Sequence, residues 1–180
     1  MNGSYVDNYA EALFELSCEQ DCLNETFDEM SALSEVFEKT PELVKFLNLP
    51  TIEWEEKERV LSETFENRLR WLTYNFLLVI SQKGRSGSFC SVFSVFKELY
   101  YEKMNILEVV AVTSRPLSDR LKEKLNKKLC EVSGKTVKLK EKTDESILGG
   151  IVLSYNNTVL SGSVKDRLDK LKAQIDSIVM

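Results

Sequence analysis

The chain has 180 residues, of which 43% are hydrophobic and 29% charged, as in an ordinary globular protein. It contains no histidine and four cysteines, so the commonest general base and the commonest metal ligand are missing. Its net charge of −5 is uneven, because residues 1–105 carry −9 and residues 106–180 carry +4. The acidic first part repels phosphate backbones and excludes most nucleic-acid partners there.

No stretch of the sequence is long enough to cross a membrane. A transmembrane helix needs roughly 18 consecutive apolar residues, and the most apolar run, 76–80, is far shorter. The N-terminal residues lack the basic and then apolar plan of a secretory signal. We therefore expect a cytoplasmic protein that reaches a membrane only through a partner.

The first part of the chain, 1–105, has the pattern of six helices joined by short turns. Ser4 and Asp7 form a capping box, and Thr40 precedes a proline that suits the first turn of a helix. The helix over 69–82 is the most apolar, so we place it in the middle of a bundle. The expected helices begin at Ser4, span 25–39 and 41–50, begin at Thr51, and span 69–82 and 89–100.

Beyond Asn105 the pattern changes to that of a small α/β unit, 106–180. The segment 107–113 is rich in β-branched residues, and 136–140 alternates polar and apolar residues as a half-exposed strand does. Ser118 caps a charged helix that ends at Gly134. Further strands are expected over 147–154 and 159–160, joined by a hairpin turn, followed by a last helix that begins at Ser163. The predicted fold is therefore α+β: an all-α six-helix N-terminal bundle followed by a small α/β C-terminal domain.

Several short motifs allow a functional and a structural interpretation. Residues 83–85, Lys-Gly-Arg, either contact a phosphate group or acidic residues of a partner, or simply end a helix. Gly149 and Gly150 indicate a bulge inside a strand, or a close backbone approach. The pair Cys18 and Cys22 has no histidine to complete a zinc site, and no cofactor or metal is expected.

A set of residues near the C-terminus is characteristic of one family. Asp144 precedes an aliphatic segment that contains Gly149 and Gly150, and Gly162 lies directly before the last predicted helix. This pattern resembles the C-terminal signature of ATP synthase delta subunits and of the mitochondrial oligomycin-sensitivity-conferring protein. Other segments similar to the family follow in the expected order, at 9–14, 41–47, 56–57, 83–85 and 112–117.

The resemblance implies a non-catalytic stator subunit that links the catalytic head of a rotary ATP synthase to its peripheral stalk. Such a subunit resists rotor torque during proton- or sodium-driven ATP synthesis, as a peripheral part of the complex at the cytoplasmic face of the cell membrane. The family's bundle binds N-terminal helices of alpha subunits, and its C-terminal domain binds the b subunit. A match to the family's first and fifth helices implies alpha-binding residues at Tyr9, Ala12, Leu13, Leu16, Phe76 and Ile80.

Two other function classes remain open from the residues alone. An RNA-binding helical bundle has the same architecture, although the acidic first part disfavours it. An enzyme with Cys90 or Cys130 as nucleophile lacks the histidine that ordinarily activates such a thiol.

Overall fold

A computed structural model describes residues 5–144, 149–155 and 158–162 of the chain. The described residues are mostly helical with one small four-stranded sheet, which confirms the α+β class. The chain divides into two compact units, Met1–Tyr100 and Tyr101–Met180. Ser4 of the predicted capping box and the predicted last helix, which begins at Ser163, lie outside the described residues.

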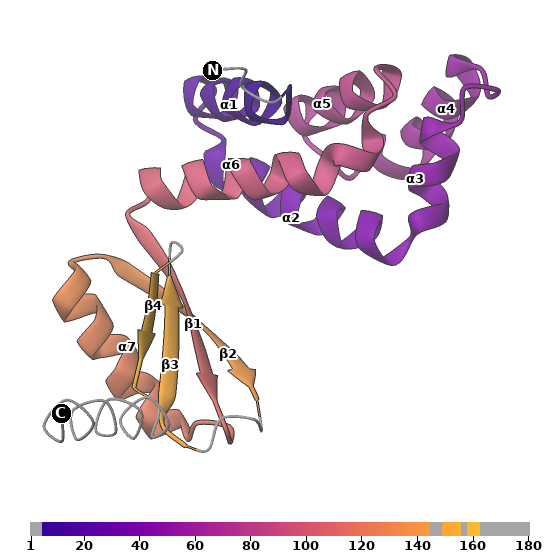
Figure 1. The fold of residues 1–180 in the computed structure, drawn as a ribbon. Helices are drawn as coiled ribbons and strands as arrows, with labels where there is room; N and C mark the ends of the chain where they lie inside the picture. Colours follow the sequence, from indigo (N-terminus) through magenta and orange to yellow (C-terminus); the bar gives the residue numbers. More distant parts are fainter. Residues whose placement is uncertain (1–4, 145–148, 156–157, 163–180) are drawn as a thin grey trace, which may run out of the picture. The chain divides into compact units, whose positions relative to one another are not determined.

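Six α-helices precede the first strand (Figure 1). A π-helical segment, Ser62–Glu66, extends the fourth helix, which begins at Trp54 rather than at Thr51 as the sequence predicted. A 3-10 turn, Ser86–Ser88, leads into the sixth. The helices are α1 (Tyr5–Glu19), α2 (Leu23–Lys39), α3 (Pro41–Asn48), α4 (Trp54–Leu61), α5 (Trp71–Gln82) and α6 (Phe89–Lys103).

Aromatic side chains from α6 form the centre of the first unit's core. Phe89 and Phe96 are fully buried at a spacing that places them on one side of the helix. Phe89 stacks on Phe37 of α2 with ring centroids 4.7 Å apart, and Phe96 meets Phe14 of α1 edge to face at 6.0 Å. These contacts tie helices α1, α2 and α6 together, and such ring pairs stabilise a core beyond the area that they bury.

Helix α5 is not buried on all sides, although its apolar composition predicted a place in the middle of a bundle. Leu77 and Ile80 are fully buried, but the side chains of Trp71 and Val79 are 70% and 44% exposed. Composition reports how apolar a helix is but not whether every side has a neighbour, so the exposed side was missed. Where such side chains join those of a neighbouring helix in one contiguous patch, they can form an interaction surface.

The start of α5 is fixed by Glu29 of α2. One carboxylate oxygen of Glu29 accepts a hydrogen bond from the Arg70 backbone N–H at 2.9 Å, and the other accepts from the Thr73 hydroxyl. A carboxylate at this position satisfies donors at the helix N-terminus that have no partner within the helix, and it complements the positive end of the helix dipole.

The second unit is a four-stranded sheet with the order β2-β1-β3-β4. Strands β1 and β2 are parallel and are connected through helix α7, whereas β3 and β4 extend the sheet as an antiparallel pair. The inward positions Val109 and Ala111 of β1 are fully buried. The elements are β1 (Ile106–Thr113), α7 (Asp119–Ser133), β2 (Thr136–Thr143), β3 (Ile151–Tyr155) and β4 (Thr158–Ser161).

Gly149 and Gly150 lie before a strand and not inside one. Their φ angles are 153° and 93°, in the region that glycine adopts readily, and β3 begins only at Ile151. The sequence predicted a strand over 147–154, but its described residues 149 and 150 are not part of β3. The β-branched residues around the glycines favour a strand, but the backbone that two successive positive φ angles require is incompatible with one.

Gly134 ends helix α7, as the sequence predicted. Its φ is 65°, and its N–H donates a hydrogen bond to the Cys130 carbonyl at 2.9 Å. A Cβ at this position would meet no atom within 4 Å, so the left-handed backbone is the only obstacle to a side chain. We expect Gly134→Ala to lower the free energy of unfolding by about 1 kcal/mol, measured by urea denaturation. Gly134→Asn should lower it less, because asparagine tolerates this conformation; equal losses in both variants would contradict the explanation.

Candidate functional site

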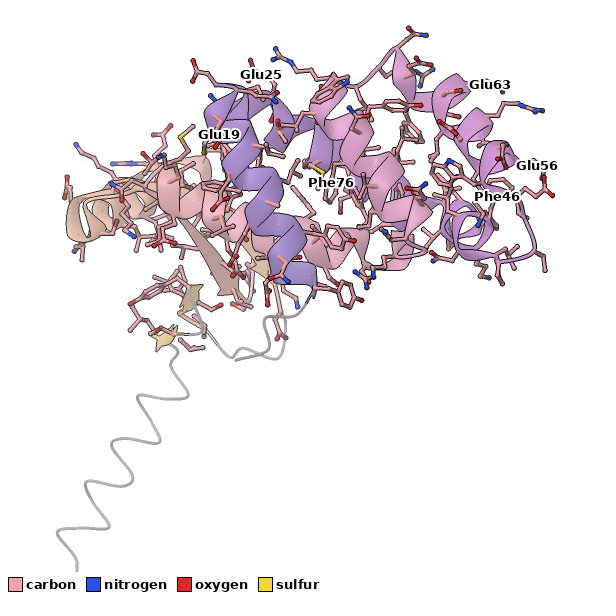
Figure 2. All side chains as sticks on the ribbon, turned by 90° about the horizontal axis from the view of Figure 1, so that it is seen from above. Glu19, Glu25, Phe46, Glu56, Glu63 and Phe76 are labelled. Atoms are coloured by element: carbon pink, nitrogen blue, oxygen red, sulfur yellow. The ribbon has the colours of Figure 1, made fainter. Side chains whose placement is uncertain are left out.

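Helices α1 and α5 lie side by side (Figure 2). Exposed and half-buried apolar side chains of both helices form a common surface. The rings of Tyr9 and Phe76 meet edge to face between the two helices, with centroids 6.3 Å apart. Both rings are half-buried, so each packs on its neighbour and still reaches solvent. We call this surface the α1–α5 face and define it by the residues Tyr5, Tyr9, Ala12, Leu16, Phe76 and Val79.

The alpha-binding residues that the resemblance implied fall into three groups according to their solvent exposure. Ala12 is exposed and Leu16 is 44% exposed, so both can contact a partner directly. Tyr9 and Phe76 are half-buried. Leu13 and Ile80 are only 2% and 0% exposed, so they support the α1–α5 face from inside the core. Helical periodicity places Leu13 beside Leu16, but it cannot tell which of two adjacent stripes faces the core.

Two exposed residues of α5 were missed by the sequence analysis. Val79 lies one turn from Phe76, and Trp71 lies two turns before Val79 on the same side of the helix. Their side chains are 44% and 70% exposed, so both are accessible to a partner. The spacing Trp71, Asn75, Val79 would have identified this row if α5 had not been assigned to the middle of a bundle.

Arg85 stands at one end of the α1–α5 face. Its guanidinium carbon lies 4.5 Å from the centre of the Tyr5 ring and 5.7 Å from that of Tyr9. One guanidinium N–H donates a hydrogen bond to the Tyr9 hydroxyl at 3.3 Å. The hydroxyls of Tyr5 and Ser88 share a hydrogen bond of 2.7 Å, which fixes the first ring. The arginine is thus held over two aromatic faces by cation–π contacts.

The turn that carries Arg85 is a helix ending of defined geometry. Gly84 has a φ of 64°, and the Arg85 N–H donates to the Ile80 carbonyl at 2.9 Å. These are the features of a Schellman motif, in which glycine takes the left-handed position after the helix. The structural interpretation of residues 83–85 as a helix stop is therefore confirmed, and the same turn directs Arg85 toward α1.

Charge is distributed unequally along the α1–α5 face. Helix α5 contains no charged residue between Trp71 and Gln82. On α1, Glu15 and Glu19 are exposed, and each follows an apolar residue of the face by one helical turn (Figure 2 labels Glu19). The face therefore has carboxylates toward the C-terminal end of α1 and Arg85 toward its N-terminal end.

The second unit holds an apolar cavity of about 340 Å³ between its sheet and α7. Val132 and Leu160 at this cavity are 80% and 51% exposed. Two residues of the C-terminal pattern, Asp144 and Gly162, are bonded to the strands through their backbone. The Asp144 N–H donates to the Thr113 carbonyl at 2.9 Å, and the Gly162 N–H donates to the Ile151 carbonyl at 2.8 Å. A Cβ at Gly162 would lie 3.2 Å from that carbonyl, which accounts for glycine there.

The cysteines form no functional cluster in the described part of the chain. Cys18, Cys22, Cys90 and Cys130 are free thiols. Among the described residues, no group of three potential ligands is placed to hold a metal ion. Within the same residues, no helix is both long and apolar enough to span a membrane.

A family model described as ATP synthase delta (OSCP) subunit matches residues 6–175. The chain belongs to this family. Delta is a non-catalytic subunit of the ATP synthase complex, so the expectation of a non-catalytic protein is confirmed by family membership.

Individual relatives agree with this assignment along the whole length. The "ATP synthase subunit delta" of Halalkalibacterium halodurans is 33% identical over 178 residues, which cover 98% of this chain and 97% of the relative. That of Alkaliphilus metalliredigens is 30% identical over 172 residues, 96% of each chain.

A solved structure shows the same fold as this delta-family chain. The similar chain comes from the cryo-EM structure of the Toxoplasma gondii mitochondrial ATP synthase hexamer, with a TM-score of 0.77 and 21% identity. The match covers 96% of this chain and 98% of that one, so the fold is shared along its length.

Proposed function

We propose that this delta-family subunit is a stator element that links the catalytic head of the ATP synthase to the b subunit of the peripheral stalk. The helical N-terminal part, residues 1–105, acts as a six-helix bundle that holds N-terminal helices of alpha subunits. The C-terminal part, residues 106–180, binds the stalk. The chain works at the cytoplasmic face of the cell membrane, which it reaches only through its partners.

The α1–α5 face is the observation that carries the proposal for the N-terminal part. It is apolar, has no charged residue on the α5 side, and is supported by buried Leu13 and Ile80. An amphipathic helix that lays its apolar side on such a surface buries Leu16 and Val79, which are now largely exposed. Burial of such side chains releases water from apolar surface on both partners and stabilises the complex.

The exposed apolar residues of the second unit support the stalk-binding proposal. Val132 of α7 and Leu160 of β4 flank the cavity described above, and neither has a buried environment among the described residues. A helical segment of the b subunit that covers them gains the same kind of apolar burial. Two interfaces on one chain transmit force between head and stalk without any chemical step.

A stator must stay bound while the rotor turns, so a slow dissociation rate is the property that its interfaces need. Nanomolar binding corresponds to about −12 kcal/mol, and a few buried anchors supply most of such a free energy in protein interfaces. The half-buried rings of Tyr9 and Phe76 are suited to this role, because aromatic anchors are enriched among such residues.

Isothermal titration calorimetry with a peptide of the N-terminal segment of this organism's alpha subunit tests the proposal. We expect saturable one-to-one binding with a negative heat-capacity change, which marks apolar burial. Trp71 provides a second signal: with Trp54 replaced by Phe, its emission should shift on titration if the peptide covers the α5 row. No heat and no spectral change with folded protein would refute binding of alpha by the N-terminal part.

A further inference from the structure

Arg85 is an exposed cation held in one place by neutral groups. The Tyr5 and Tyr9 rings and the Tyr9 hydroxyl hold the guanidinium, and Ser88 fixes Tyr5. Within the described residues, no carboxylate of the chain lies within ion-pair distance of Arg85. One of its five N–H donors is used by Tyr9, which leaves donors for a ligand.

This arrangement differs from that of an ordinary surface arginine. A free arginine loses much side-chain entropy when it binds an anion, and that cost offsets most of the gain. Stacking on the Tyr5 ring at 4.5 Å restricts the side chain before any partner arrives. A planar guanidinium in a fixed position binds a carboxylate through two parallel hydrogen bonds, which makes the contact strong and directional.

We propose that Arg85 binds a carboxylate side chain of the helix that docks on the α1–α5 face and thereby fixes the direction and register of that helix. The inference rests on the proposed function, because it assigns a role within the same interface. The charge pattern of the face supports it. A helix with an acidic residue at the Arg85 end and basic residues toward Glu15 and Glu19 is attracted at both ends. The reversed helix places like charges together at both ends and is rejected.

The turn at the end of α5 places Arg85 accurately enough for this task. The Schellman motif around Gly84 connects the arginine directly to the buried residue Ile80 through a backbone hydrogen bond of 2.9 Å. A binding group on a helix end that is packed in the core moves less than one on a free loop, and precise placement is what a directional contact requires.

The test is a thermodynamic cycle of binding affinities with the alpha N-terminal peptide and a set of variant peptides. In each variant peptide, called an amide copy, one Asp or Glu is replaced by its amide. We expect Arg85→Gln to weaken binding of the unmodified peptide about tenfold. One amide copy should bind the wild-type chain about as weakly as the unmodified peptide binds Arg85→Gln. This critical amide copy should have the same affinity for the wild type and for Arg85→Gln. Lys83→Gln is the matched control, since Lys83 is exposed in the same turn but is not stacked, and it should change affinity less than about twofold.

Two further variants separate recognition from folding. Tyr5→Leu removes the stacked ring but keeps the charge. Because Tyr5 also belongs to the α1–α5 face, we expect some loss for every peptide, with a larger factor for the unmodified peptide than for the critical amide copy. Arg85→Lys should recover little affinity, because an ammonium cannot form the planar pair. Equal affinities of wild type and Arg85→Gln, or a loss shared by every amide copy, would overturn the inference while leaving the proposed function intact. Absence of peptide binding by the wild type would overturn both.

Discussion

Leu16→Asp is expected to weaken binding of the alpha N-terminal peptide at least about 30-fold without a change in protein stability. Leu16 is 44% exposed on the α1–α5 face, so an aspartate there stays hydrated in the free protein. In the complex the same carboxylate would be buried against an apolar helix, which is unfavourable without a partner charge. Calorimetry gives the affinity, and the urea midpoint of the free chain reports its stability.

The matched control is Leu49→Asp, because Leu49 is 45% exposed at the end of α3 and does not belong to the α1–α5 face. That variant should bind the peptide as the wild type does. Leu13→Asp is unsuitable for this purpose: Leu13 is 2% exposed, and a charge there would unfold the helices rather than report on binding. If Leu16→Asp and Leu49→Asp bind equally well, the docking surface lies elsewhere.

Phe89→Ala is expected to destabilise the chain by about 3 to 5 kcal/mol. Phe89 is fully buried, stacks on Phe37 of α2 at 4.7 Å and contacts Phe76 of α5 at 6.2 Å. Its removal leaves a cavity where three helices meet, and a loss of this size is a large part of the stability of a typical domain. Urea denaturation followed by helical circular dichroism measures it.

Phe89→Leu is the informative comparison, because it preserves apolar volume and should cost much less than the alanine variant. Since Phe76 belongs to the α1–α5 face, Phe89→Ala should also weaken the peptide complex through a displaced Phe76 ring. An alanine variant with wild-type stability would show that Phe89 does not hold the helices together.

Hydrophobic periodicity and helix-ending residues predicted the secondary structure wherever local propensity agreed with the tertiary environment. Gly134 ends α7, the alternation over 136–140 forms part of β2, and the β-branched run beginning at Leu107 forms β1. The π-helical segment after Leu61 has no residue pattern that distinguishes it from an α-helix, so the sequence could not reveal it.

The site was predictable only in part, because exposure depends on neighbours that sequence does not place. The resemblance named Tyr9 of α1 and Phe76 of α5, and the rings of these two residues meet in the structure. It did not separate Leu13, which is core, from Leu16, which is surface. For residues 83–85 the sequence left a partner contact and a helix stop both open. It could not show that Arg85 stacks on Tyr5, because the two residues are far apart in the chain.

Strand β2 is at the edge of the described sheet, and its side chains bear on the fate of subunits that have not yet been assembled. An edge strand offers unpaired backbone groups that can recruit a second copy and begin aggregation. Lys138, Lys140 and Lys142 project alternately with other residues along β2 and are all exposed. Two such edges brought together would set lysines against lysines, so mutual repulsion opposes edge-to-edge association of two unassembled copies.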